Sequence, residues 1–228
     1  MSIIAALASA RDSIVGSDGR RFSSAIWERG VVTVPPRIDR DDFDKTFVLN
    51  NGRMVGAFCG LLEFGGLTVG NHVQRIVEPL LLGDPDLSTL TDAVRGELSE
   101  RLRNINDQEV AFDFRKVDLI LVGGRNLSRA NMRIVAFRFF PSNGRIESAI
   151  EEVLPDKRSN KYYLFGDDQA QGGARKFFEN DRSPSRDARV LQHLVRTSIA
   201  RGIESSGKGP NGQDPACGGT IFIKRTWH

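Results

Sequence analysis

The sequence predicts an α+β fold in which two stacked antiparallel sheets lie between two helical layers. Segments occur in blocks along the chain: strands, two helices, strands, two helices and a last strand. Helices grouped in this way argue against a parallel sheet, whose strands alternate with single helices. The 228 residues, 39% of them hydrophobic and 27% charged, suffice for one substantial core, so we expect a single domain over residues 1–228.

Nine segments are expected to form strands. Each is rich in Ile, Val, aromatic or small residues and is bounded by turn residues. In chain order they are residues 2–8, 13–20, 45–50, 53–60, 117–124, 132–140, 146–154, 161–168 and 219–227. Asn51-Gly52, the strongest short hairpin signal, joins the third segment to the fourth. Ser142-Asn143-Gly144 provides a turn after the sixth segment.

Four segments have apolar residues at helical spacing, which predicts helices packed by one face. They are residues 67–82, 84–105, 170–179 and 186–203. Pro79 is expected to end or kink the first helix, and turn and cap residues open the second. We expect long connections at residues 22–44, which carry two prolines and many charges, and at the Gly-rich residues 205–215.

Composition argues against several classes of protein. The sequence has no run of 18 or more apolar residues, so we expect no membrane span. The N-terminus lacks the basic stretch of a signal peptide. Two cysteines, Cys59 and Cys217, are too few for a disulfide scaffold or a structural zinc site, so we expect a reduced, cytoplasmic protein. The net charge of +3 is spread without a basic stripe, which argues against nucleic-acid binding. Residues 207–212 do not match a phosphate-binding loop.

The second residue, Ser2, is a candidate nucleophile. Removal of Met1 would expose it, because methionine trimming tolerates a small second residue. A free N-terminal serine joins a hydroxyl to an α-amine, and an amine pKa of about 7.7–8.0 allows general-base work near neutral pH. Retention of Met1 would block this chemistry. Many ordinary proteins begin Met-Ser, so Ser2 gains meaning only from residues farther along the chain.

Several short motifs follow Ser2 in a fixed order. They are S-D-G-R at 17–20, Lys45 opening a strand, Cys59-Gly60 ending the next strand, G-D-D-Q at 166–169 and D-P-A-C-G-G at 214–219. Asp18 lies 16 residues after Ser2. This order and spacing resemble the proteasome β-type family, which includes the bacterial HslV peptidase and the Anbu proteins. The resemblance covers nearly the whole chain and implies the four-layer αββα sandwich of the N-terminal nucleophile hydrolases.

The resemblance also implies roles for individual residues. Asp18 would hold Lys45 charged, and Lys45 would lower the pKa of the nucleophile and the amine. The N–H of Gly60 would stabilise an oxyanion, with Cys59 as a small apolar neighbour. Asp214 and Cys217 match the family's supporting aspartate and serine, and Asp167 and Arg20 are possible further support. No cofactor or metal is expected, and the relatives form rings or related homo-oligomers.

The chain departs from the family pattern at three positions. Asp167 and Gln169 replace serines of the G-S-G-S turn, and Cys217 replaces a serine with a thiol, which is a weaker hydrogen-bond donor. These departures keep a second hypothesis open, in which the chain is a non-catalytic structural or assembly subunit of the same fold. A third is a small-molecule amidase of the same class. Neither the substrate nor any ATPase partner is readable in the sequence.

Each site residue also has an ordinary structural interpretation. Asp18 could be a turn aspartate, and Lys45 could be an exposed lysine that protects a strand edge. Asp167 and Asp168 could bind a metal, although acids before a helix more often cap it. His72 and His193 lie in predicted helices and have no pattern typical of a triad or a metal site, so we expect packing or surface roles.

Overall fold

The computed structural model describes most of the chain. The described residues are 2–9, 12–23, 26–28, 31–34, 36–83, 85–124, 132–155, 159–180, 187–210 and 212–226. The predicted mixture of antiparallel sheets and four helices is confirmed. Within the described residues, no helix combines the length and the hydropathy that crossing a bilayer requires.

The larger sheet has five antiparallel strands. Across the sheet they are β13 (Arg145–Val153), β12 (Met132–Ser142), β11 (Val117–Gly124), β8 (Met54–Gly60) and β7 (Thr46–Leu49). The hairpin predicted at Asn51-Gly52 is confirmed, since Leu49 pairs with Met54 across a turn over Asn50–Gly52. Asn50, Asn51 and Gly52 all have positive φ angles, the backbone conformation that asparagine and glycine adopt most readily.

The second sheet has four antiparallel strands, and the N-terminal strand lies at its centre. The order is β14 (Lys161–Gly166), β1 (Ile3–Ala8), β2 (Ser13–Ser17) and β15 (Phe222–Arg225). Ile3 pairs with Gly166, and Ile4 pairs with Ser17. The start of β1 is therefore held between the end of β14 and the end of β2.

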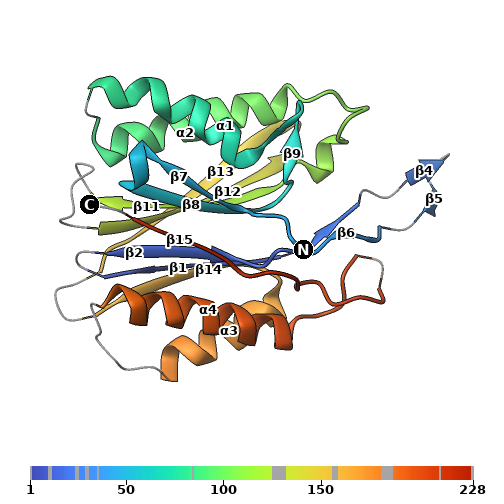
Figure 1. Ribbon diagram of the computed structural model, residues 1–228. Coiled ribbons are helices and arrows are strands. Elements are labelled where there is room, and N and C mark those ends of the chain that lie inside the picture. The colour runs from blue at the N-terminus through green and yellow to red at the C-terminus, as the bar shows by residue number, and fades with distance from the viewer. Residues whose placement is uncertain are drawn as a thin grey trace.

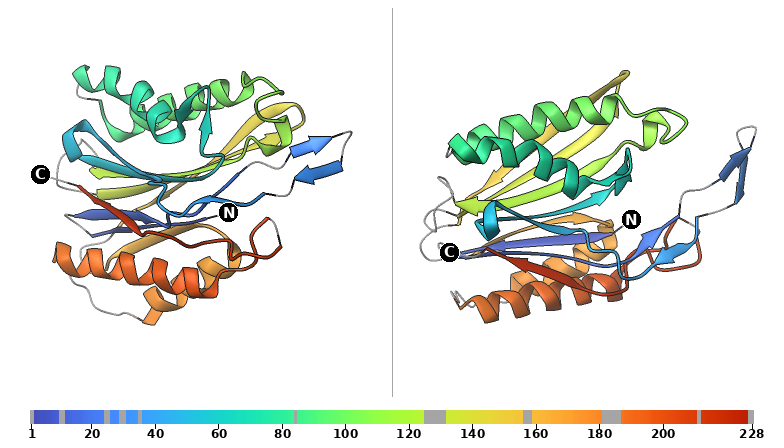
Figure 2. Two further views of the ribbon diagram at one scale, coloured as in Figure 1. Left: turned by 45° about the vertical axis from the view of Figure 1, so that its right-hand side comes forward. Right: turned by 45° about the horizontal axis from the view of Figure 1, so that its top comes forward.

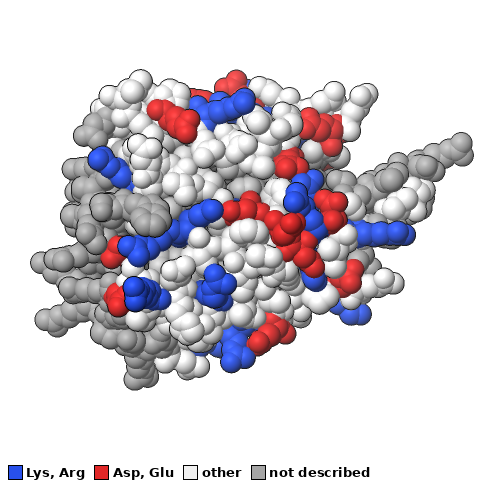
Figure 3. Space-filling model, in the orientation of Figure 1, with Lys and Arg blue, Asp and Glu red and all other residues white. Residues whose placement is uncertain are grey.

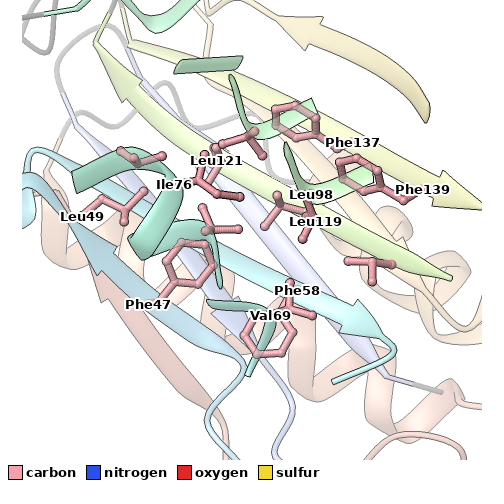
Figure 4. Packing of buried hydrophobic residues seen from close by; sticks show 14 of the residues in the cluster. Phe47, Leu49, Phe58, Val69, Ile76, Leu98, Leu119, Leu121, Phe137 and Phe139 are labelled. Atoms are coloured by element: carbon pink, nitrogen blue, oxygen red, sulfur yellow. The ribbon is translucent and has the colours of Figure 1, made fainter. Parts of the chain in front are cut away.

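Helices cover the outer faces of both sheets (Figure 1). Helices α1 (Val69–Val77) and α2 (Leu87–Arg103) pack on the five-stranded sheet, and α3 (Asp168–Asn180) and α4 (Ala188–Ser205) pack on the four-stranded sheet. Figure 4 shows the first of these contacts, where Phe47, Leu49 and Phe58 of the sheet face the helices. A third apolar cluster fills the space between the two sheets, with Ile4 and Ala6 on one side and Val55 and Ala57 on the other.

The helix boundaries follow from local chemistry. Thr68, Asp86 and Asp187 each cap a helix with a side-chain oxygen that accepts a backbone N–H of the first turn. The break expected at Pro79 is confirmed, because α1 ends at Val77 and a 3₁₀ segment over Glu78–Gly83 follows. A further 3₁₀ turn spans Phe112–Phe114.

The prediction that residues 22–44 form mainly a long connection is wrong. This segment contains β3 (Arg21–Phe22) paired with β6 (Ile38–Arg40), and β4 (Ile26–Glu28) paired with β5 (Val31–Val34). The β4–β5 hairpin projects away from the rest of the molecule (Figure 2). Prolines and charges suggested a coil, but short two-stranded ribbons tolerate both because their outer edges need no partner. A small hairpin of β9 (Glu63–Phe64) and β10 (Leu67–Thr68) was also not predicted.

Two predicted strands are too long. β2 ends at Ser17 and not at Arg20, and the last strand covers only Phe222–Arg225 of the predicted residues 219–227. In both cases the residues outside the strand make contacts that a straight strand would not allow. Asp18 turns its carboxylate onto neighbouring backbone, and Gly219 adopts a positive φ of 77°.

Candidate active site

Ser2 lies at the start of the central strand β1 and is almost fully buried, with 3% of its surface exposed. Its C=O accepts the N–H of Asp167 at 2.8 Å. Gly166 has a φ of 122°, and a Cβ on it would collide with the Ser2 carbonyl, so only glycine allows this approach. Met1, whose removal the sequence argument requires, lies outside the described residues.

Asp18 and Lys45 form an ion pair with no exposed side-chain surface on either partner. Lys45 Nζ lies 2.9 Å from Asp18 Oδ1 and donates a second hydrogen bond, of 2.6 Å, to the C=O of Arg20. Asp18 Oδ1 also accepts the N–H of Ile3 at 3.0 Å, and Oδ2 accepts the N–H of Gly218 at 3.0 Å. These backbone bonds offset part of the cost of removing two charges from water.

The Arg20 side chain extends from the buried pair toward solvent. Its guanidinium binds both carboxylate oxygens of Asp41, at 2.7 and 3.1 Å, and donates to the C=O of Pro215 at 3.1 Å. The hydrogen bond to Asp41 raises the pKa of Arg20, and the negative charge of Asp214 adds to this shift. Asp214 itself is half-buried, and its C=O accepts the N–H of Gly209 at 2.6 Å. Its predicted support of an amine at Ser2 stays a prediction.

Cys217 is fully buried immediately before Gly218, whose N–H binds Asp18. Burial raises the pKa of its thiol, and the nearby negative charges of Asp18 and Asp167 raise it further. The thiolate, which is the reactive form of cysteine, is therefore disfavoured at this position. Burial likewise raises the pKa of Cys59, which packs in the cluster between the sheets as expected.

Gly60 is the last residue of β8. This strand runs beside Lys45, because the N–H of Phe58 donates to the Lys45 C=O at 3.0 Å. The φ of 89° at Gly60 and the closeness of this residue to the carbonyl of Lys116 both require glycine. Gly60 is exposed, so its backbone is open to a ligand. The role of its N–H as an oxyanion donor stays a prediction.

Asp167 acts as a helix cap, as one of the sequence interpretations proposed. Its Oδ1 accepts the N–H of Ala170 at 2.9 Å and that of Gly207 at 3.1 Å, which ties the start of α3 to the loop after α4. Its own N–H holds the Ser2 carbonyl. Among the described residues, no three His, Cys, Asp or Glu side chains converge on a position for a metal ion.

The structure thus brings Ser2, Asp18, Lys45, Cys217 and Asp167 into one connected group, bounded by Arg20 on one side. The sequence argument missed Asp41, Gly166 and Gly218 as members of this neighbourhood. Asp41 lies in the charged run 37–45, where nothing in its spacing distinguishes it from its neighbours. Gly166 and Gly218 belong to predicted motifs, but only their backbone contacts reveal why glycine stands there.

The buried Lys45 cation beside β1 can activate a nucleophile at the start of that strand. Its positive charge favours the deprotonated form of nearby hydroxyl and amino groups. A hydroxyl with a neighbouring amine as base is an activated nucleophile. The antiparallel sheets and the outer helices have the arrangement of a proteasome-type fold, and the Lys–Asp pair lies next to β1.

Comparison of structures agrees with this class. The chain matches the solved structure of an Anbu (Gly-1) mutant from Hyphomicrobium sp. strain MC1 with a TM-score of 0.52, over 99% of this chain and 82% of that one. Anbu is an HslV-like bacterial homologue of proteasome type. The two sequences are 13% identical, so the likeness is one of fold. Neither a protein-family model nor a curated protein matches the sequence.

Proposed function

We propose that this chain is a proteasome-like N-terminal nucleophile hydrolase that cleaves amide bonds in peptides. In this proposal the sheets and helices form the αββα sandwich of that class, built as a single domain over residues 1–228. Met1 is removed, and Ser2 becomes the N-terminal residue. The fold-level likeness to Anbu supports the class, and the group around Ser2 supports the reaction.

The reaction follows from the positions of these groups. Ser2 Oγ bonds to the carbonyl carbon of the scissile amide as its proton moves to the α-amine, directly or through a water. The N–H of Gly60 stabilises the oxyanion. When the C–N bond breaks, the protonated α-amine gives its proton to the leaving nitrogen. Water then hydrolyses the ester on Ser2, which releases the acid product and restores the serine.

One observation carries the proposal. Asp18 Oδ1 accepts hydrogen bonds from both Lys45 Nζ and the N–H of Ile3, the residue next to Ser2. A single carboxylate oxygen therefore ties the buried cation to the nucleophile's own strand. This link places the buried charge pair beside the residue that would carry the nucleophile.

The proposal also covers the substrate, the location and the assembly of the protein. A peptide or protein substrate, a cytoplasmic location and assembly into a homo-oligomer all fit a proteasome-type chain. Nothing in the residues points to a particular ATPase partner. A second candidate, a non-catalytic subunit of the same fold, is favoured by Cys217, because this buried thiol stands where the family has a serine.

The test is intact mass spectrometry before and after incubation with a peptide epoxyketone, an electrophile that reacts with a hydroxyl and its neighbouring amine. We expect loss of Met1 and a single adduct at Ser2. The variant Ser2→Ala should form no adduct, whereas Ser206→Ala, which removes a hydroxyl after α4, should react like wild type. Retained Met1 with no adduct would favour the non-catalytic subunit.

A further inference from the structure

Three segments far apart in sequence cross beside the Asp18–Lys45 pair. They are residues 18–20 after β2, residues 41–45 before β7 and residues 215–220 before β15. Backbone hydrogen bonds join them: the N–H of Gly19 donates to the Gly218 C=O at 3.1 Å, and that of Phe43 donates to the Gly19 C=O at 3.0 Å. Figure 3 shows that charged side chains gather where β6 meets the body of the molecule.

Arg20 and Asp41 contact all three segments. The guanidinium of Arg20 binds Asp41 through two parallel hydrogen bonds and reaches the third segment at the Pro215 C=O. Asp41 contacts the third segment with its backbone, because its C=O accepts the N–H of Thr220 at 2.7 Å. Paired hydrogen bonds of this kind set orientation as well as distance, so the pair can hold the crossing in one geometry.

Close backbone packing shows how little freedom the crossing has. A Cβ on Gly219 would collide with the carbonyl of Asp41, and one on Gly19 would lie 2.6 Å from the same oxygen. A Cβ on Gly218 would lie 2.6 Å from the central carbon of the Arg20 guanidinium. At these three glycines the segments therefore lie directly against Asp41 or Arg20.

The crossing holds two of the partners of the buried pair. The Arg20 C=O accepts from Lys45 Nζ, and the Gly218 N–H donates to Asp18 Oδ2. We infer that Asp41 is a positioning residue, which acts through Arg20 to hold Lys45 and Asp18 in register with Ser2. This inference rests on the proposed function for its kinetic consequence, but the geometry it describes can be measured separately.

The kinetic test compares two neighbouring aspartates. Asp41→Asn removes the charge that binds Arg20, and Asp42→Asn removes the charge of the neighbouring aspartate, which binds Arg40 at 2.9 Å instead of Arg20. We expect Asp41→Asn to lower the maximal rate of adduct formation at Ser2 on the order of tenfold, with little change in the half-saturating concentration. Asp42→Asn should react like wild type, and Asp41→Glu, which keeps the charge, should recover part of the rate.

The structural test needs no activity. Hydrogen exchange followed by mass spectrometry should show faster exchange than in wild type in residues 216–222 of Asp41→Asn, where the Gly218 and Thr220 amides lie. The same residues of Asp42→Asn should exchange at the wild-type rate. Should Asp41→Asn not fold, Arg20→Lys takes its place, because it keeps the charge and loses the paired bonds. If wild type forms no adduct, the proposed function fails while exchange still tests the crossing. Exchange of Asp41→Asn equal to that of Asp42→Asn would overturn the inference. Where wild type forms the adduct, equal reactivity of the two variants would overturn it as well.

Discussion

At the scale of single residues, the buried Asp18–Lys45 pair is the most demanding feature of the chain. Transfer of each ion from water costs several kcal/mol even after the protein relaxes, on the order of 20 kcal/mol in the idealised limit. The pair persists because each partner has a second role: Asp18 accepts the backbone N–H groups of Ile3, Arg20 and Gly218, and Lys45 donates to a backbone carbonyl. Loss of either partner leaves a buried charge without its counter-ion.

Replacement of Lys45 should be among the most destabilising changes at the site. We expect Lys45→Met to lower the free energy of unfolding by about 3–5 kcal/mol, because the Asp18 carboxylate stays buried without its cation. The double variant Asp18→Asn/Lys45→Met should recover part of this loss, because no net charge remains. Urea unfolding at pH 7 measures both. A loss below about 1 kcal/mol in Lys45→Met would mean that water reaches Asp18.

Alanine substitutions of Gly166 and Gly144 distinguish the cost of a positive φ angle from the cost of a steric clash at Cβ. Both glycines have positive φ angles, but a Cβ on Gly166 meets the Ser2 carbonyl, whereas one on Gly144 meets open space. Gly144→Ala should therefore cost only the backbone strain, about 1–2 kcal/mol. We expect Gly166→Ala to cost clearly more in urea unfolding and to abolish adduct formation at Ser2. Equal costs for the two variants would contradict the close approach of Gly166 to Ser2.

At the scale of elements, the β9–β10 hairpin depends on His72 of α1. The imidazole stacks on Phe64 with 3.8 Å between ring centroids, and its Nε2 lies 3.0 Å from the Phe64 C=O. A carbonyl only accepts, so Nε2 carries the proton and Nδ1 faces Arg101 Nη1 at 3.4 Å. Burial lowers the pKa of His72, and the charges of Arg101 and Arg75 lower it further, while the hydrogen bond to the Phe64 C=O and the charge of Glu109 act in the opposite direction.

This histidine should make stability depend on pH. Its pKa is lower in the folded chain than the ordinary value of 6.5, so the unfolded chain binds more protons and stability is lost as pH falls below that value. We expect wild type to lose more unfolding free energy between pH 7.5 and 5.5 than His72→Gln does. The exposed His193 on α4 provides the control, and His193→Gln should follow wild type. Parallel pH curves for all three proteins would refute this account.

At the scale of the whole molecule, the two sheets approach through small side chains. Ala6, Ala8, Ala57, Cys59 and Ala136 lie in the cluster between them, together with larger residues such as Ile4 and Phe165. Close-packed interiors respond to even one added methylene group. The separation of the sheets, and with it the meeting of Lys45, just before β7, with Asp18, just after β2, therefore depends on these positions.

Overfilling the space between the sheets should be costly. Ala57→Leu adds bulk on the inner face of β8 and should lower the free energy of unfolding by about 1–3 kcal/mol. Ala149→Leu makes the same change at an exposed position of β13 in the same sheet and should change it by no more than about 0.5 kcal/mol. Urea unfolding of the two variants checks this. A tolerated Ala57→Leu would indicate unfilled space between the sheets.

Much of the architecture could be predicted because its signals are local. Helical spacing, the cap residues before α2, the break at Pro79 and the Asn51-Gly52 turn each act over a few neighbouring residues. Antiparallel sheets and four helices follow from these signals. Ser2 is a candidate because of the chemistry of an N-terminal serine, and Asp18 and Lys45 are candidates because of the resemblance to the proteasome β-type family. The structure brings the three into one neighbourhood.

The remaining features depend on contacts between distant parts of the chain. Gly218 binds Asp18 across 200 residues of sequence, and no periodicity or turn signal reports such a contact. Asp41 and Asp42 look alike in the charged run 37–45, yet only Asp41 faces Arg20 at the crossing. Local signals in the sequence predict most of the helices and strands, and the resemblance of its motifs to a known family supplies the candidate residues. The path of the folded backbone alone determines which of these residues meet, because burial and long-range hydrogen bonds exist only once the layers have packed.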